Sequence, residues 1–453
     1  MKTITGNEFD NYLKTITVNS ENDSTEKTVK EIINAVRAGG DAAVRRYASL
    51  FDRSSPETLE VPPNKIRDAV IKLEKSDAAL ARALELAAQN IKRFSLKQRE
   101  QYIDFEFENS PGVFTGQKVI PVGRAAVYVP GGRFPLISSA LMCLIPAFSA
   151  GVDEVCLASP PGADGIPDTR ILAAAGIAAK VCGRLDNGFR SFAIGGAQAI
   201  AALALGTETI PRCDVVSGPG NKYVAAAKRL LFGETGIDFI AGPSDILVIM
   251  DEDSRPELAA ADMLAQAEHD PDARARALVP NQKTADRLMA ALNEKLAELN
   301  AAGSSMTPPS ANVPLIAQQS LDNGGLIIIY KNREEAVKIA NAVAPEHLEL
   351  QVSGPDNWIS LLKNYGSLFT GPLSAEVLGD YSAGLNHTLP TLGTSRFSSG
   401  LSVRYFLRTL TTLRCSNSHH PDNNGYAAAL DAAETIARAE GLAAHAESAR
   451  IRR

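Results

Sequence analysis

Several features that mark specialised protein classes are scarce in this chain of 453 residues. It has five cysteines, an odd number without C-x-x-C spacing, which favours reduced thiols over a disulfide framework. Its longest apolar stretch, 140–150, is interrupted by Pro146 and is shorter than the roughly 18 residues of a membrane span. No basic segment followed by an apolar one opens the chain. We therefore expect a soluble cytoplasmic protein that does not bind a membrane.

The chain has no excess of basic charge, and it has few histidines. The net charge is −6, with 45% hydrophobic and 22% charged residues, so we expect small molecules and not nucleic acid as partners. The length corresponds to roughly two to four domains of about 100–200 residues each. Of the six histidines, His419 and His420 lie in a polar loop and are expected to be solvated, whereas the other four lie in motif-like surroundings.

The first 110 residues are charged and have helical periodicity, with no catalytic constellation. A helix from about residue 24 is expected to end at Gly39 and Gly40, and a second follows through Tyr47. Residues 64–94 predict one or two further helices. This segment is expected to be a helical arm that packs on another part of the protein.

From Gly123 the pattern becomes α/β. A short apolar strand, a glycine turn and a helix recur three times, which predicts a parallel, doubly wound sheet with its ligand at the carboxyl ends of the strands. The three units are 125–150, 192–205 and 214–231. Their glycine turns suit an anion such as a pyrophosphate at the following helix, but any α/β fold needs such turns and no G-x-G-x-x-G is present.

A second α/β section begins with an apolar strand at 246–250 and a helix that starts near Pro256 and is stopped by Pro271. Gln266 and His269 are three residues apart on this helix, so both can point at one metal ion. The alternative is an ordinary histidine in the last turn of a helix.

Two later segments carry further polar groups. Glu346 and His347 follow Pro345 between a helix at 333–343 and a strand at 348–352, and they suit a general acid/base pair or a plain surface turn. In the polar loop 379–390, Asp380 is a candidate oxygen ligand. His387 is either another ligand or a turn cap.

The last segment, 425–453, is an alanine-rich helix that carries Glu440 and His445. Residues five apart point about 140° away from each other on a straight helix. Joint use of the two side chains therefore requires a break, which Gly441 can provide.

Six motifs spread over 122–445 resemble those of the histidinol dehydrogenase family. They are Gly195-Gly196-Ala-Gln198-Ala-Ile-Ala, Gly218-Pro219-Gly220-Asn221, Gln266-Ala-Glu-His269-Asp-Pro-Asp-Ala, Pro345-Glu346-His347-Leu348, Gly379-Asp380-Tyr381 with Asn386-His387-Thr-Leu-Pro390, and Glu440-Gly-Leu-Ala-Ala-His445. The resemblance implies two incomplete Rossmann-like parallel-sheet domains with an N-terminal helical arm and a C-terminal helical tail. The implied segments are the arm with its connection at 1–120, an NAD-side domain at 121–237, a domain with metal and acid/base residues at 238–385, and a tail at 386–453 exchanged in a homodimer.

The same resemblance implies the site residues and the reaction. One zinc ion per subunit would be held by Gln266, His269, Asp380 and His445, with Glu346 and His347 as the acid/base pair. Substrate contacts would come from Ser244, Gln266, His269, His347, Asp380, Glu440 and His445, and NAD contacts from Tyr128, Gln198 and Asn221. Because the tail is exchanged, His445 and Glu440 would complete the partner's site. The implied reaction oxidises L-histidinol to L-histidine through the aldehyde, with two NAD.

Two places depart from the family pattern. The pair Arg133-Phe134 resembles the residues at this position in paralogues that oxidise other alcohols, such as sulfopropanediol. The Arg133 guanidinium can bind an anionic substrate group, the NAD pyrophosphate or a surface carboxylate. Arg404-Tyr405 stands where an acidic residue is common, whereas 398–403 and the pair Glu440 and His445 look like the biosynthetic enzymes. A zinc hydrolase with Glu346 as base is the alternative of a different class. A non-catalytic metal-stabilised scaffold would leave Glu346 and His347 unexplained.

Overall fold

The computed structural model describes all residues except 10, 12–22, 55, 132–134, 303–312 and 417–423. The chain divides into two compact units. The first contains Met1–Leu96 and Gly123–Phe406, and the second contains Lys97–Val122 and Leu407–Arg453. Among the described residues, no helix is both long and apolar enough to cross a membrane.

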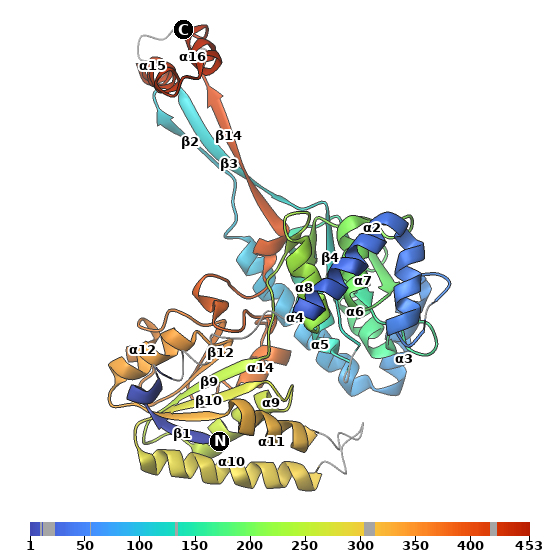
Figure 1. The fold of residues 1–453 in the computed structure, drawn as a ribbon, viewed down its shortest axis with the longest axis vertical. Coiled ribbons are helices and arrows are strands. Elements are labelled where there is room, and N and C mark those ends of the chain that lie inside the picture. Colours follow the sequence, from blue (N-terminus) through green and yellow to red (C-terminus); the bar gives the residue numbers. More distant parts are fainter. Residues whose placement is uncertain (10, 12–22, 55, 132–134, 303–312, 417–423) are drawn as a thin grey trace. The chain divides into compact units, whose positions relative to one another are not determined.

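The first unit contains a five-stranded parallel sheet in the order β6-β5-β4-β7-β8. Its central strand, β4, is labelled in Figure 1. Its strands are β4 (Arg124–Tyr128), β5 (Glu154–Ser159), β6 (Phe189–Ala193), β7 (Val215–Ser217) and β8 (Gly236–Ile237). The helices between them are α5 (Ile137–Ala150), α6 (Thr169–Val181), α7 (Gly196–Leu205) and α8 (Lys222–Leu231). Short strands that are buried on both faces need mainly apolar residues, as the sequence has here. The predicted parallel sheet with three glycine turns is confirmed.

A second parallel sheet in the same unit has the order β1-β11-β10-β9-β12-β13. Its strands are β1 (Lys2–Thr5), β9 (Asp245–Met250), β10 (Arg274–Val279), β11 (Leu326–Ile329), β12 (His347–Gln351) and β13 (Ser367–Thr370). The helices and 3₁₀ turns that accompany it are α9 (Pro256–Ala267), α10 (Gln282–Ala302), α11 (Val313–Gly324), α12 (Arg333–Val343), α13 (Asp356–Ile359), α14 (Glu376–Tyr381), η1 (Thr394–Arg396) and η2 (Val403–Phe406).

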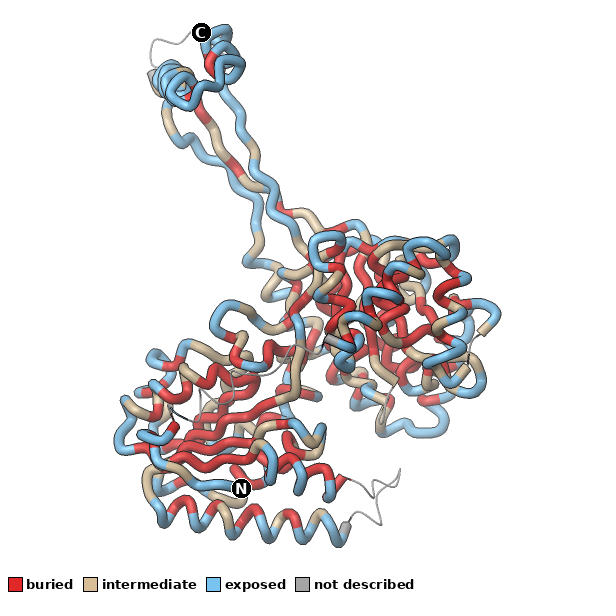
Figure 2. Tube along the Cα trace, viewed as in Figure 1, coloured by how far each residue is buried: buried red, intermediate tan, exposed pale blue. Residues whose placement is uncertain are grey.

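The alternation of side chains along β9 explains how this sheet is covered. Ile246 and Val248 pack with α9, α10 and α11, whereas Leu247 and Ile249 pack with α12 and the segment around Trp358 on the opposite face. Figure 2 shows the central strands of both parallel sheets as buried. Every residue of β9 and of β12 is buried, so these strands form a rigid support for the loops at their ends.

The N-terminal residues pack closely with both sheets. Helix α2 (Asp23–Phe51), kinked at Gly40, covers α7 and α8, and α3 (Pro63–Ser76) packs on α6. Strand β1 extends the edge of the second sheet beside β11. In α4 (Ala78–Arg99), the Asn90 amide donates a 2.7 Å hydrogen bond to the carbonyl of Ser382, next to α14. The segment expected to be an arm therefore also contributes a strand and supports for functional loops.

The second unit contains an antiparallel sheet in the order β14-β3-β2, which the sequence analysis did not predict. Its strands are β2 (Phe105–Ser110), β3 (Val113–Pro121) and β14 (Leu407–Cys415), and two helices follow, α15 (Asn424–Ala439) and α16 (Ala443–Arg450). Gly441 lies between the helices with φ +76°, so the expected break in the C-terminal helix is confirmed. All five cysteines of the chain are free thiols.

Candidate active site

A cavity of about 180 Å³ lies at the amino ends of β9 and β12. On the side of the second sheet it is lined by Ser244, Gln266, His269, Glu346, His347 and Asp380. Across from them lie Ser138 at the start of α5 and the Pro219-Gly220 turn after β7 of the first sheet. The cavity therefore brings together all the predicted substrate and metal residues except the two in the C-terminal tail.

Glu346 is fixed by a reciprocal pair of hydrogen bonds to the start of β9. Its backbone N–H donates to Asp245 Oδ1 at 2.6 Å, and its Oε2 accepts from the Asp245 backbone N–H at 3.0 Å. Burial raises the pKa of Glu346 well above its usual value, and the adjacent Asp245 carboxylate raises it further. A carboxylate with a raised pKa is a stronger base once ionised. The alternative of a surface turn at this position is wrong, because Glu346 and His347 are both buried.

His347 is the first residue of β12, and its imidazole is enclosed. Its Nε2 lies 3.5 Å from Glu376 Oε1 and 3.8 Å from Glu346 Oε1, and the ring packs against Phe369. Burial lowers the pKa of His347 to about 4, although the Asp380 carboxylate opposes this shift. At neutral pH the imidazole is therefore neutral and can accept a proton.

Several buried ligand atoms have no hydrogen-bond partner, three of them on residues that line this cavity and one on Glu376 beside His347. They are Gln266 Oε1, Asp380 Oδ1, Glu376 Oε1 and His347 Nδ1. Within the described part of the chain, His347, Glu376 and Asp380 each offer a ligand atom within 4.8 Å of the others. Buried polar atoms without partners are costly, and oxygen and imidazole nitrogen atoms are suitable ligands for zinc. The residues present therefore fit a metal ion.

The sequence analysis overlooked Glu376, which belongs to this group. Desolvation raises the pKa of Glu376 to about 10, and the Asp380 carboxylate adds to the shift. Its backbone N–H donates to Glu349 Oε1 at 3.1 Å, which ties α14 to β12. A signal was available, because Glu376 precedes Asp380 by four residues and so shares a helix face with it.

One expectation for the histidines needs correction. Helix α9 ends at Ala267, so His269 lies in the following turn, where its N–H donates to the Gln266 carbonyl, and not in the last helical turn. The helix ends earlier because the chain turns before Pro271, which disfavours helical geometry at the residue before it. His387, which was left without a definite role, lines the same cavity, with its Nε2 3.1 Å from Ser138 Oγ.

The predicted cofactor residues line a separate cavity of about 630 Å³ at the carboxyl ends of β4 to β7. Tyr128 ends β4, and its hydroxyl accepts a hydrogen bond from the Gly196 N–H at 3.1 Å. Gln198 is buried in the first turn of α7. Asn221 caps α8 through bonds from the Tyr223 and Val224 N–H groups. All three predicted residues therefore share one cavity at the expected edge of the first sheet.

Other predicted residues lie elsewhere. Glu440 and His445 are exposed residues of the second unit. Arg133 and Phe134, together with His419 and His420, lie outside the described residues. In η2, the Arg404 guanidinium lies over the Tyr405 ring, 5.2 Å from its centroid, and the Tyr405 hydroxyl donates to the Ser399 carbonyl.

Two doubly wound sheets, a buried glutamate and histidine pair, and adjacent unpartnered ligand atoms define an α/β enzyme with acid/base and metal-compatible groups in one pocket. Comparison with known proteins identifies the family. Residues 16–453 match the histidinol dehydrogenase family model. The chain therefore belongs to the histidinol dehydrogenase family, whose members are NAD-dependent oxidoreductases.

Individual relatives agree with this assignment. The chain is 42% identical over 426 residues to a histidinol dehydrogenase of Prochlorococcus marinus (strain MIT 9313), covering 94% of this chain and 89% of the relative. It is 41% identical to one of Aquifex aeolicus (strain VF5), covering 94% and 92%. The crystal structure of histidinol dehydrogenase from Elizabethkingia anophelis matches with a TM-score of 0.84 at 31% identity, covering 96% of this chain and 93% of that chain.

Proposed function

We propose that the protein oxidises L-histidinol to L-histidine through L-histidinal, with two NAD, as the last step of histidine biosynthesis. The observation that carries this proposal is the buried pair of Glu346 and His347 beside unpartnered ligand atoms at a small cavity. A neutral imidazole and a basic carboxylate are the two groups that successive oxidation of an alcohol and an aldehyde requires. A cytoplasmic setting belongs to the proposal and is supported by the five free thiols.

The metal ligands in this proposal are Gln266, His269 and Asp380 of one subunit and His445 of the partner subunit. The unpartnered Gln266 Oε1 and Asp380 Oδ1 support the first part of this set. A bound zinc ion would supply a template for the amino and imidazole nitrogens of the substrate. The residues of this chain then orient the hydroxyl carbon toward the acid/base pair.

His347 acts first in the proposed mechanism. Its neutral imidazole takes the hydroxyl proton as the carbinol carbon is oxidised to the aldehyde. NAD, which Tyr128, Gln198 and Asn221 would hold, would supply the hydride acceptor. Glu346 then takes a proton from water as the water attacks the aldehyde carbon. The tetrahedral adduct is then oxidised to the carboxylic acid, for which a second bound NAD would supply the hydride acceptor, and the acid releases its proton to solvent. Ser244, which hydrogen-bonds the Glu346 carboxylate, and His387 are placed to bind the substrate.

The proposed assembly is a homodimer with shared active sites. Glu440 and His445 flank Gly441 and the start of α16, and both are exposed in the second unit. Exchange of this tail would let the partner's His445 complete the ligand set and the partner's Glu440 contact the substrate. Mixing inactive His347→Asn protein with inactive His445→Asn protein, after reversible dissociation, should restore part of the activity. No restored activity would contradict the shared site.

The function is tested by counting NADH formed per L-histidinol consumed by the zinc-loaded protein. A ratio of about two supports the proposal, because each of the two oxidations reduces one NAD. Turnover of sulfopropanediol without turnover of histidinol would reassign the substrate. Zinc-dependent hydrolysis with no oxidation of any alcohol would favour a hydrolase instead.

A further inference from the structure

The carboxylate of Asp52 also lies in the cofactor cavity, but Asp52 is not among the predicted NAD contacts. It follows Phe51, the last residue of α2, and it lines the cavity together with Tyr128, Gln198 and Asn221. The N-terminal segment thus brings an acidic group to the carboxyl edge of the first sheet. No step of the proposed mechanism uses this group.

The Asp52 carboxylate occupies the start of α7. Its Oδ2 accepts hydrogen bonds from the Gly195 N–H at 3.2 Å and from Gln198 Nε2 at 3.4 Å. A Cβ atom at Gly195 would lie 2.6 Å from Asp52 Oδ1 and 2.6 Å from Pro160 Cγ, so the carboxylate and Pro160 lie together over this turn. A helix N-terminus is a common site for a phosphate group. Here the chain's own carboxylate takes that place, so a cofactor phosphate is excluded from it.

The neighbouring strand end lacks the acidic residue that usually recognises NAD. In Rossmann folds that bind NAD, an acidic residue about 20 residues after the glycine-rich turn of the first strand hydrogen-bonds the ribose 2′-hydroxyl. The sheet order makes β4 the first strand and β5 the second, and β5 is followed by Pro160 and Pro161. Asp52 lies beside Pro160 and brings a carboxylate to this place from a different element.

Resting on the proposed use of NAD, we propose that Asp52 binds the adenosine ribose diol of the cofactor and makes the enzyme select NAD over NADP. The two hydroxyl groups of the ribose donate to the carboxylate oxygens, which have acceptor capacity beyond their two long hydrogen bonds. A 2′-phosphate at the same place would meet a negative charge in a partly enclosed cavity and would be repelled.

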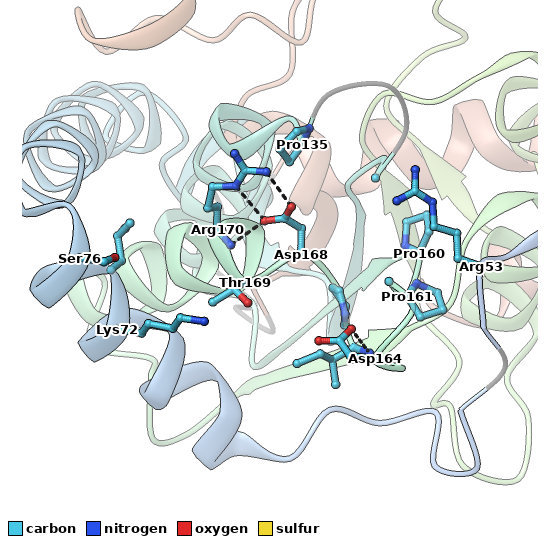
Figure 3. Close-up of a pocket in the computed structure, with 15 residues that line it drawn as sticks. Arg53, Lys72, Ser76, Pro135, Pro160, Pro161, Asp164, Asp168, Thr169 and Arg170 are labelled. Atoms are coloured by element: carbon cyan, nitrogen blue, oxygen red, sulfur yellow. Dashed lines mark hydrogen bonds and ion pairs between the residues drawn. The ribbon is translucent and has the colours of Figure 1, made fainter. Parts of the chain in front are cut away.

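The electrostatics of the cavity agree with this role. Burial raises the pKa of Asp52 above its usual value, and the bonds from Gly195 and Gln198 only partly oppose the shift. Two additional donors from a ribose would stabilise the ionised form. The next residue, Arg53, lines the same cavity and also an adjoining cavity of about 560 Å³, in which Figure 3 shows it beside Pro160 and Pro161. Arg170, also in Figure 3, is paired with Asp168 at 2.9 Å. The exposed Arg53 is thus a nearby cation that a 2′-phosphate can reach once the carboxylate is neutralised.

The test compares binding of NADH and NADPH to the zinc-loaded protein by titration of their fluorescence, without substrate. Wild-type protein should bind NADH at least about 100-fold more tightly than NADPH. Asp52→Asn should weaken NADH binding about 10-fold, because a hydrogen bond to a charged group is lost, and should strengthen NADPH binding. The ratio of the two dissociation constants should therefore fall by at least about 10-fold. Asp68→Asn, a substitution at an exposed acid of α3, is the matched control and should leave both constants unchanged.

Asp52→Ser provides a second variant that removes the charge and most of the side-chain volume, and it should lower the NADH to NADPH preference in the same direction. Thermal unfolding of each variant shows whether the fold is intact. An unchanged preference in a folded Asp52 variant would overturn the inference. If wild-type protein bound neither dinucleotide, the proposed function itself would fail, and this result is distinct from an unchanged ratio.

Discussion

The two parallel sheets of the first unit share one order over five strands, with β1 added in the second, but their predicted functional residues lie at opposite edges. In the first sheet, β6-β5-β4-β7-β8 is the order 3-2-1-4-5 of an incomplete Rossmann fold, and β11-β10-β9-β12-β13 repeats this order in the second. The cofactor cavity lies at the carboxyl ends of the first set of strands. The acid/base and metal-compatible groups lie at the amino ends of the second. One topology therefore serves two kinds of chemistry.

The difference follows from the residues at the two edges. At the carboxyl edge of the first sheet, glycines allow the backbone to approach a ligand. Gly218 adopts φ +112°, and its Cα packs closely against the backbone carbonyl oxygen of Tyr128. At the amino edge of the second sheet, side chains supply the functional groups, because Glu346 and His347 are buried at the start of β12. Backbone groups at glycine turns are suited to contact a cofactor that is bound and released. Buried side chains suit groups whose proton affinity must be shifted.

The substitution His347→Asn should have the largest effect and should distinguish the roles of the two sheet edges. Loss of the base should lower kcat by about 10³-fold or more, since general base catalysis contributes about 10²- to 10⁴-fold. Zinc content and NADH affinity should stay within about twofold of wild type, because His347 is assigned neither to the metal nor to the cofactor. Metal analysis and NADH titration check this prediction, and loss of zinc would make His347 a ligand.

His269→Asn should act mainly through loss of the proposed metal ion. Removal of a ligand should weaken zinc binding by at least about 100-fold, since even outer groups that orient ligands contribute about 10- to 100-fold. Competition with a chelator measures this affinity. The control is Asp270→Asn at the adjacent exposed residue, which should retain zinc. Equal retention of zinc by both variants would remove His269 from the ligand set.

Gly218→Ala tests the carboxyl edge of the first sheet. An added Cβ would lie 2.1 Å from the Tyr128 carbonyl oxygen, so the turn beside the cofactor cavity must move. We expect a loss of about 2–3 kcal/mol in the free energy of unfolding and about 10-fold weaker NADH binding, with zinc binding unchanged. Gly233→Ala is the control, because Gly233 also has positive φ but a Cβ added there would have no atom within 4 Å. Equal effects of both substitutions would show that backbone strain alone is responsible.

The smallest expected effect is a pH-dependent gain in stability from Glu346→Gln. Because burial raises the pKa of Glu346, its protonated form favours folding below the unfolded pKa, and this contribution is lost as pH rises through the folded pKa. A neutral amide avoids that loss. The variant should therefore unfold about 2 °C above wild type at pH 8 and close to wild type at pH 4, measured without metal. If the difference in unfolding temperature between variant and wild type became smaller as pH rises, the raised pKa of Glu346 would be contradicted.

The parallel sheets and most of the site were predictable from the sequence, because apolar runs, glycine turns and local pairs are short-range signals. Such signals predicted where β9 and β12 begin. They also predicted the helix 333–343 and the break at Gly441. Long-range pairings were not predictable. The antiparallel strands β3 and β14 pair residues almost 300 positions apart, such as Val119 with Thr409. Asp52 and Gln198 are also brought together only by the packing of α2 on α7.

The burial of residues in short helices and the exact ends of helices were hardest to predict from the sequence. Glu376 shares a helix face with Asp380, but this spacing alone does not distinguish a buried carboxylate from a solvated one at the start of a short helix. Its burial comes from contacts with β12, through Glu349, that the sequence does not reveal. His269 was placed in a helix because Pro271 limits the helix end only to within a few residues.

The separation of the two edges is tested most directly by titrating NADH into Asp380→Asn protein. This variant should lose zinc, because Asp380 is a proposed oxygen ligand, yet it should bind NADH within about twofold of wild type. That result would show that the carboxyl edge of the first sheet holds the cofactor without help from the metal site. A loss of NADH affinity of 10-fold or more in the folded variant would contradict the account.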